Sequence, residues 1–300
     1  MEALAPPFSL IRRLFRAGQL IPFLGAGASL VGRTSEDKWL ADTPQFLPRA
    51  NELAVDLASL SNFPSDEAIE LAKVAQYFEA VAAGRTQLKN RLQAVLGGSF
   101  SPGALHELLA EQTAPLLIVT TNYDDLLERA LTLANRPFDL VVHATDRTLG
   151  HAVLWRPHGA SSYRRVAPNR LYIDLDTTTV LYKMHGSIAR PPLESGQFVI
   201  TEDDYVDFVA RMVASRAIPA IITARFSQLP FLFFGYGLRD WNFRVVLSRI
   251  RRQPADGADL RSWAVQGTCT PLERAMWQQR GVTLVEMLID DFVQQLRESP

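Results

Sequence analysis

The feature that most constrains the fold of this chain is a series of short, continuously apolar segments separated by helical patterns. Six segments have this character, at residues 20–24, 115–121, 180–185, 230–237, 262–266 and 282–287. Continuous rather than alternating hydrophobicity is typical of strands that are covered on both faces, as in a parallel sheet between two layers of helices. Helical patterns follow the second, fourth and fifth segments. The sequence therefore predicts an α/β fold with a doubly wound, mostly parallel sheet.

The length of 300 residues is enough to bury one large core, and we expect a single domain over residues 1–300. Helical patterns between the first two apolar segments predict four consecutive helices, which would form a helical insertion subdomain at about residues 34–112. A second, smaller insertion is expected at about residues 190–228, where the segment TEDDYVDFVARMVASRA has a helical pattern.

The charge balance and the single cysteine exclude several classes of protein. With 31 basic and 32 acidic side chains the formal net charge is −1, which argues against direct binding to nucleic acid through bulk electrostatics. Cys269 alone cannot build a four-thiolate zinc site, and the histidines lack metal-ligand spacing, so we expect no metal. No apolar run reaches the roughly 20 residues that span a bilayer, so we expect a cytoplasmic protein without membrane contact.

The first apolar segment ends in the sequence GAGAS, residues 25–29. Gly25 and Gly27 allow a phosphate group to approach the backbone, and Ser29 adds a hydroxyl, as in sites that hold a pyrophosphate at a helix N-terminus. The pattern lacks the third glycine of G-x-G-x-x-G and the acidic residue expected about 20 positions later. A tight turn required only for packing is therefore the alternative interpretation.

The second apolar segment ends in a run of polar residues. Asn122, Asp124 and Asp125 follow Thr121 directly and lead into a helical pattern. Polar residues at the carboxyl end of a parallel strand stand where α/β folds bind ligands, and Asn and Asp are also preferred helix caps. We interpret Asp125 as the helix cap, and Asn122 and Asp124 as functional residues. Thr121 belongs to the candidate binding residues of the same segment.

Two later segments end in residues suited to a ligand site. His185 follows an apolar segment and precedes a glycine, where it can act as a base or as a hydrogen-bond partner. His158 also precedes a glycine, but it follows a poorer strand, and His106 is expected to pack or cap within a helix. The fourth segment ends in Gly235-Tyr236-Gly237, and Asp240 then stands at a helix start as either a ligand contact or a cap.

Five blocks of the chain, taken in this order, resemble the sirtuin-like family of NAD-binding Rossmann domains. The blocks are PFLGAGAS, LHELLAEQTAPLLIVTTNYDDLLERAL, LYKMHGSI, FVITEDDY and FLFFGYGLRDWNFR, and together they extend over nearly the whole chain. The branch most resembled is the prokaryotic one found in anti-phage defence, in which the domain hydrolyses NAD+. The resemblance implies a Rossmann-like fold with NAD+ as the substrate.

The resemblance also implies roles for individual residues. The residues that would line the pyrophosphate site are Gly25, Ala26, Gly27 and Ser29. Asn122 and Asp124 would lie near the nicotinamide ribose, and His185 would be the catalytic histidine. The residues that would close around the nucleotide are Gly235, Tyr236 and Asp240.

Two departures from protein-deacylating sirtuins point to water as the acceptor. The chain has no four-cysteine zinc module, and VGRTSEDKWLADTPQF stands where those enzymes have Gly-Ile-Pro-Asp-Phe-Arg. We therefore hypothesise hydrolysis of NAD+ to nicotinamide and ADP-ribose. Asn122 would orient water or the ribose hydroxyls, Asp124 would stabilise the developing cation, and His185 would accept from a ribose hydroxyl.

Other classes of function fit the same residues. The pocket could hold NAD or ADP-ribose as a signal without turnover, or the protein could transfer ADP-ribosyl or acyl groups to proteins. An unrelated Rossmann dehydrogenase fits less well, because the acidic residue for the adenosine ribose is absent. Since uncontrolled NAD+ hydrolysis would kill its host, we expect a toxic defence effector controlled by homo-oligomer assembly or by a partner, such as an ATPase or a nucleic-acid-guided protein.

Overall fold

The computed structural model of the chain describes residues 6–34, 36–144, 152–188, 197–213, 218–236 and 261–299. Each of the six apolar segments forms a strand: β1 (Ile21–Leu24), β2 (Leu117–Thr120), β6 (Val180–Lys183), β9 (Phe231–Phe234), β10 (Ser262–Gln266) and β11 (Val282–Glu286). Most of their side chains are buried on both faces of the sheet, as continuous hydrophobicity predicts. All six segments pair in parallel with their neighbours, which confirms the predicted α/β fold with a mostly parallel sheet.

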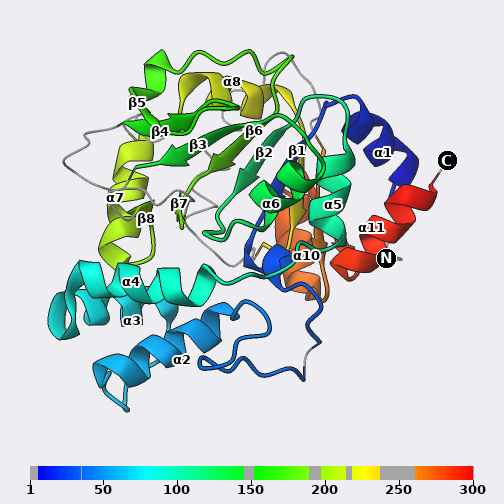
Figure 1. The fold of residues 1–300 in the computed structure, drawn as a ribbon. Coiled ribbons are helices and arrows are strands. Elements are labelled where there is room, and N and C mark those ends of the chain that lie inside the picture. The colour runs from blue at the N-terminus through cyan, green and yellow to red at the C-terminus, as the bar shows by residue number, and fades with distance from the viewer. Residues whose placement is uncertain are drawn as a thin grey trace.

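Three further strands extend the sheet at one side. β3 (Asp139–His143) pairs in parallel with β6, and β4 (Val153–Arg156) and β5 (Arg164–Val166) follow in antiparallel pairing. Among the described residues the sheet therefore has nine strands, in the order β11-β10-β9-β1-β2-β6-β3-β4-β5. Figure 1 labels the strands from β1 to β5 in this order. A separate pair, β7 (Gly186–Ser187) and β8 (Gln197–Phe198), is antiparallel.

The strand order places a topological switch at β1. β1 is followed by β2, which pairs on one side of it. β9 pairs on the other side of β1 and is followed by β10, which lies one strand farther from β1. The loops that leave the carboxyl ends of β1 and β9 therefore diverge to opposite sides. In open α/β sheets a crevice forms at such a point, and ligands bind there.

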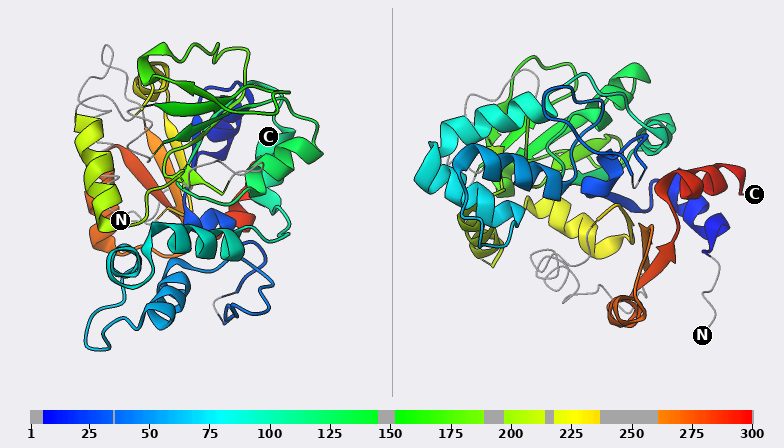
Figure 2. Two further views of the ribbon diagram at one scale, coloured as in Figure 1. Left: turned by 60° about the vertical axis from the view of Figure 1, so that its left-hand side comes forward. Right: turned by 90° about the horizontal axis from the view of Figure 1, so that it is seen from below.

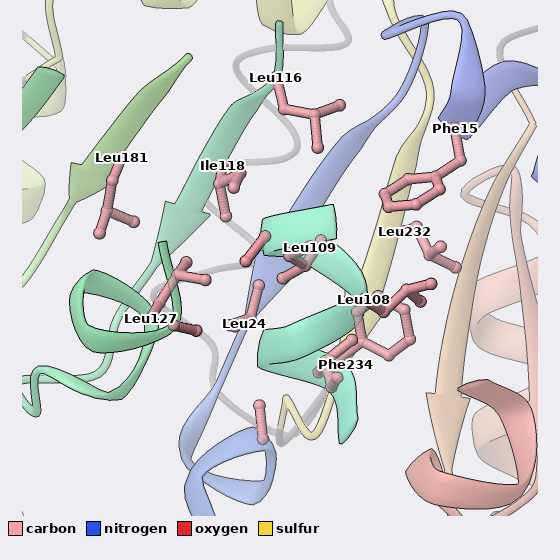
Figure 3. Close-up of a cluster of buried hydrophobic side chains, with 14 of the residues drawn as sticks. Phe15, Leu24, Leu108, Leu109, Leu116, Ile118, Leu127, Leu181, Leu232 and Phe234 are labelled. Atoms are coloured by element: carbon pink, nitrogen blue, oxygen red, sulfur yellow. The ribbon is translucent and has the colours of Figure 1, made fainter. Parts of the chain in front are cut away.

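Helices cover both faces of the sheet. One face carries α1 (Phe8–Arg16), α5 (Ala104–Glu111), α6 (Leu126–Leu133) and α11 (Ile289–Glu298), whose apolar residues meet those of the strands in one core (Figure 3). The other face carries α7 (Glu202–Val213), α8 (Ala220–Gln228) and α10 (Pro271–Gln278) over a second core. The first and last helices lie side by side, with the Phe8 and Phe292 rings 5.2 Å apart (Figure 2). This two-sided cover is the doubly wound arrangement predicted from the sequence.

A third core lies at the end of the sheet to which the strands' carboxyl ends point. It is built by α2 (Ala50–Ser61), α3 (Leu71–Tyr77) with a following π-helical turn at Phe78–Ala82, and α4 (Gly84–Leu96), here called the helical module (Figure 1). Its apolar residues pack against Tyr123, Leu126 and Ile188, which follow β2 and β6. The helical module thus covers the loops in which the sequence placed its candidate residues.

None of the helices among the described residues is both long enough and apolar enough to cross a membrane.

Candidate active site

The two glycine-containing turns pack directly against each other. β1 and β9 are paired, with Leu24 opposite Phe234, and the N–H of Gly27 donates to the carbonyl of Gly235 at 2.8 Å. A Cβ added at Gly25 would lie 2.6 Å from the Cα of Tyr236, and one added at Gly235 would lie 2.3 Å from the backbone nitrogen of Ala28. These glycines are therefore required by backbone-to-backbone contact, whatever ligand the turns also hold.

A chain of hydrogen bonds joins the first turn to the loop after β2. The Nδ2 atom of Asn122 donates to the Gly25 carbonyl and to the Ser29 hydroxyl, both at 2.8 Å. That hydroxyl in turn donates to Oδ2 of Asp124 at 2.7 Å. Three candidate side chains from two loops thus form one network, here called the Ser29–Asn122–Asp124 network.

The direction of this network determines what Asn122 presents. The Ser29 hydroxyl has one proton and gives it to Asp124, so it must accept from Asn122. Nδ2 is thereby fixed toward the protein, and Oδ1 has no hydrogen-bond partner among the described residues. An amide oxygen in this position can accept a hydrogen bond from a water molecule or from a hydroxyl group of a ligand.

His185 reaches the same edge of the sheet from the neighbouring strand. β2 and β6 are paired with Thr120 opposite Lys183, and the N–H of Met184 donates to the Thr120 carbonyl at 2.9 Å. Asn122 and His185 each stand two residues beyond that paired position. Two strands that are separate in the sequence therefore bring these two residues to adjacent loops.

His185 is only 6% exposed, and α7 covers its ring. Its ring makes edge-to-face contacts with Tyr205 and Phe208, at centroid distances of 5.6 and 5.3 Å. Burial lowers the pKa of His185 to about 4, so the ring is neutral at neutral pH. A neutral imidazole can accept a proton or a hydrogen bond from a hydroxyl group.

The helical module holds the start of α7 in place. Arg85 donates to Oδ2 of Asp204 at 2.7 Å and to the carbonyl of Phe198 at 2.6 Å. Gln76 and Asp203 exchange two further hydrogen bonds, at 3.0 and 3.2 Å. The cover over His185 is thus connected to the module that packs on Tyr123.

A cleft of about 280 Å³ opens at the switch point, beside the carboxyl ends of β1, β9 and β10. Its lining includes Gly27, Arg33, His106, Gly235, Gln266 and Asp290. His106 is buried and accepts a 3.2 Å hydrogen bond at Nδ1 from the N–H of Gly103, so the expectation that it packs and caps its helix is confirmed. Burial lowers the pKa of His106, which favours the neutral ring.

The remaining candidates have different surroundings. Ala26 is exposed in the turn after β1, and the N–H of Thr121 donates to the Leu24 carbonyl at 3.1 Å. Tyr236 is buried, with its ring 5.3 Å from that of Phe23. Asp240 lies outside the described residues.

The expectation that Asp125 caps α6 is confirmed for its position at the helix start but not for its side chain. Asp125 occupies the N-cap position, but its carboxylate makes no capping hydrogen bond and instead pairs with Nε of Arg129 at 2.9 Å. Asp124 accepts from the N–H of Leu126 at Oδ1, at 3.2 Å, and so supplies that contact. Asp124 therefore serves the helix start and the Ser29–Asn122–Asp124 network at once.

Sequence reasoning overlooked Lys183. Its side chain is 1% exposed inside the sheet, and it contacts the loop that carries Asn122 and Asp124. The available signal was a lysine within an otherwise apolar strand, VLYK, since lysine is almost never fully buried unless it is paired. Within the described ranges, no group of three or more His, Cys, Asp or Glu residues could hold a metal ion.

Sequence comparison gives three informative similarities to known proteins. The chain is 29% identical over 205 residues to the NAD(+) hydrolase ThsA of Acinetobacter baumannii, and 27% identical over 235 residues to ThsA of Bacillus cereus. It is 23% identical over 245 residues to defense-associated sirtuin 2 of Bacillus subtilis. These matches cover 67%, 76% and 80% of this chain, but only 35%, 39% and 20% of the respective relatives.

The family model of the SIR2-like domain matches residues 116–285, which is more than half of the chain. The matched region begins just before β2 and ends within β11, so it includes Asn122, Asp124 and His185. Together with the mostly parallel sheet, this match shows that the chain belongs to the SIR2-like domain family.

Proposed function

We propose that this protein is an NAD+ glycohydrolase, which cleaves NAD+ with water to give nicotinamide and ADP-ribose. The observation that carries the proposal is the position of the turn after β1. Gly27 and Ala28 line the cleft at the switch point, and Ser29 belongs to the Ser29–Asn122–Asp124 network. A dinucleotide that crosses this turn has one end in the cleft and the other beside Asn122.

The cleft is suited to binding the adenosine half of NAD+. Its volume of about 280 Å³ is near the lower limit for small-molecule pockets, about 300 Å³, so it would take half of the dinucleotide rather than all of it. Gln266 and Asp290 offer hydrogen-bonding groups for ribose hydroxyls. The nicotinamide half then lies toward β2 and β6, where Asn122 and His185 stand.

The reaction needs little covalent chemistry from the protein. The bond between nicotinamide and C1′ breaks, its electron pair leaves with the neutral nicotinamide, and positive charge builds on the ribose. Water then adds to C1′ and loses one proton to the solvent. On this proposal, Oδ1 of Asn122 orients the water or a ribose hydroxyl, and the Asp124 carboxylate stabilises the cation. The neutral imidazole of His185 accepts from a ribose hydroxyl.

The burial of His185 adds a requirement to the proposal. His185 is buried, and Tyr205 and Phe208 pack against its ring. Productive binding therefore requires α7 to withdraw from the ring. Such a step would keep the resting protein from hydrolysing NAD+, as a toxic defence effector must.

The similarities to ThsA hydrolases and to a defense-associated sirtuin support NAD+ hydrolysis and a role in anti-phage defence by depletion of NAD+.

Control of the hydrolysis by assembly or by a partner protein is part of the proposal. Nicotinamide release per protomer, measured over a wide range of protein concentration, tests assembly. A rate per protomer that does not depend on concentration would count against it.

The direct test is release of nicotinamide from NAD+ by the purified chain. We expect cleavage by the parent, and a loss of about 100-fold or more in Asn122→Ala and in His185→Ala, as for other residues that act in the transition state. His158→Ala is the matched control, because His158 also precedes a glycine but is exposed. If both site variants cleave as fast as the parent, the site is misplaced.

The same experiment separates the other functions. Tight binding of NAD+ by calorimetry without nicotinamide release would favour a sensor module. Radiolabel from NAD+ that remains covalently on protein would favour an ADP-ribosyltransferase.

A further inference from the structure

A buried lysine lies directly beneath the loop that carries the candidate residues. The ammonium of Lys183 donates to the carbonyl oxygens of Tyr123, at 3.3 Å, and of Asp124. It also donates to Oε1 of Glu128, at 2.7 Å, in the first turn of α6. An ammonium has three protons, so these three acceptors satisfy it completely.

The three acceptors belong to one short segment, residues 123–128, whereas the donor belongs to another strand. Side chains alternate along β6, and Leu181 packs in the core beneath α6, so Lys183 points to the same face. His185 follows two residues later on the same strand. One ammonium therefore fixes the loop of Asn122 and Asp124 relative to the strand that leads to His185.

Two details show that the contact orients the loop as well as holding it. The Tyr123 carbonyl also accepts from the N–H of Ile188, at 2.9 Å, so it is held from two sides. With the carbonyls of residues 123 and 124 bound to Lys183, the Asp124 side chain accepts from Ser29. Free rotation of these peptide groups would break the Ser29–Asn122–Asp124 network.

We infer that Lys183 is a positioning residue for the proposed hydrolysis, which holds Asn122 and Asp124 in register with His185 through the carbonyl oxygens of residues 123 and 124. This inference rests on the proposed function. A displacement of about 1 Å in a catalytic group can cost about 100-fold in rate, so the expected loss is in kcat. Substrate binding by the turn after β1 and by the cleft is largely retained.

The test uses the double variant Lys183→Met/Glu128→Gln, because removing Lys183 alone would leave Glu128 unpaired. We expect it to unfold cooperatively, to release nicotinamide with kcat lowered about 100-fold, and to keep KM within about threefold of the parent. The matched control is Arg91→Met/Asp56→Asn, which removes an ion pair in the helical module. We expect that control to leave kcat unchanged.

Glu128→Gln alone leaves Lys183 without its counter-charge and should lower the free energy of unfolding. It keeps the ammonium on both carbonyl oxygens, however, and we expect kcat of the folded variant within about threefold of the parent. A 100-fold loss in this single variant would assign the effect to Glu128 and overturn the inference, even if the double variant fails to fold. A folded double variant with parental kcat would also overturn the inference and leave the proposed function intact.

If the parent releases no nicotinamide at any protein concentration, hydrolysis by the chain without a partner protein fails, and a crystal structure of the double variant still tests the inference. We then expect Asp124 to leave Ser29 and Asn122 to leave the Gly25 carbonyl. Retention of the 2.7 Å and 2.8 Å bonds would show that Lys183 does not position the loop.

Discussion

The hydroxyl of Ser29 donates a 2.7 Å hydrogen bond to Asp124, although the two residues are 95 positions apart in the sequence. Ser29 closes the short 3₁₀ turn at Ala26–Ser29, and Asp124 precedes α6. The bond therefore joins the turn that lines the cleft to the loop that presents Asn122. It also fixes the direction of the network, since Asn122 must donate to the same hydroxyl.

Replacement of Ser29 by alanine removes this bond and is expected to weaken the proposed activity more than the fold. Asn122 keeps its 2.8 Å bond to the Gly25 carbonyl, so the loop stays attached but loses its orientation. We expect nicotinamide release to fall by about 10- to 100-fold. The free energy of unfolding should fall by about 1 kcal/mol, the usual net contribution of one hydrogen bond.

Ser59→Ala is the matched control for Ser29→Ala, because the Ser59 hydroxyl donates to a helix carbonyl at an exposed site in α2. Urea unfolding and a nicotinamide release assay, run on both variants, give the two quantities. Equal rates of NAD+ cleavage in Ser29→Ala and Ser59→Ala would contradict the assigned role of the network.

Gly235→Ala tests the close approach of the two turns. Gly235 has a φ of +57°, and an added Cβ would lie 2.3 Å from the backbone nitrogen of Ala28, which cannot move away as a side chain could. We expect a loss of about 3 kcal/mol or more in the free energy of unfolding. Nicotinamide release should fall with it, because the same turn lines the cleft.

Gly267→Ala provides the comparison, since Gly267 also lines the cleft but its added Cβ would meet only a Leu288 methyl carbon, at 3.6 Å. We expect its unfolding free energy to stay within about 0.5 kcal/mol of the parent. Denaturant unfolding measures both variants. Similar unfolding free energies for the two would mean that the turns are not held as close as described.

The strands of the parallel sheet could be predicted because their sequence signal is local. In IPFL and FLFF, for example, apolar side chains fill both faces, so hydrophobicity alone marks the strand. β3 was missed because its two ends are polar. Asp139 is buried only because it accepts from the Trp155 indole and from the N–H of His158, each at 2.8 Å. Those partners come from a later hairpin, which sequence periodicity does not reveal.

The candidate site was only partly predictable for the same reason. Strand ends in a parallel sheet meet at one edge, so the neighbourhood of Asn122 and His185 followed from the fold class. Which of Asp124 and Asp125 accepts from the first N–H groups of α6 could not be predicted from the fold class, because both precede the helix and tertiary partners decide between them. Lys183 was missed because two of its three acceptors are backbone carbonyls, which carry no sequence signal.

Glu52→Gln is expected to weaken the attachment of the helical module to the cleft. Both oxygens of Glu52 accept from Arg33, at 2.7 Å each, and the Arg33 side chain is fully buried. These hydrogen bonds, with backbone N–H groups of Arg49 and Trp39, lower the pKa of Glu52 to about 2. The neutral amide leaves Arg33 without its counter-charge, which should cost about 3 kcal/mol at pH 7.

The pH dependence of the unfolding free energy tests the Arg33–Glu52 ion pair. Because the pKa of Glu52 is lowered from 4.5 on folding, its stabilisation is fully present above pH 4.5 and is lost as the pH falls toward 2. Urea unfolding should therefore show a difference between parent and Glu52→Gln at pH 7 that shrinks at pH 3. Glu67→Gln, at the exposed pair with Lys73, should cost less than about 1 kcal/mol. A pH-independent difference for Glu52→Gln would refute the assignment.

His185 should make the free energy of unfolding depend on pH in a higher pH range than Glu52 does. Burial lowers its pKa from 6.5 to about 4, so the unfolded chain binds a proton between these values and the folded chain does not. Its contribution to stability is therefore present above pH 6.5 and is lost as the pH falls toward 4, by an amount on the order of 3 kcal/mol. His185→Phe removes the titrating group and keeps an aromatic ring beside Tyr205 and Phe208. We expect the unfolding free energy of the parent to fall more than that of the variant between pH 7.5 and pH 4.5, and parallel curves would mean that the ring is not held neutral beneath α7.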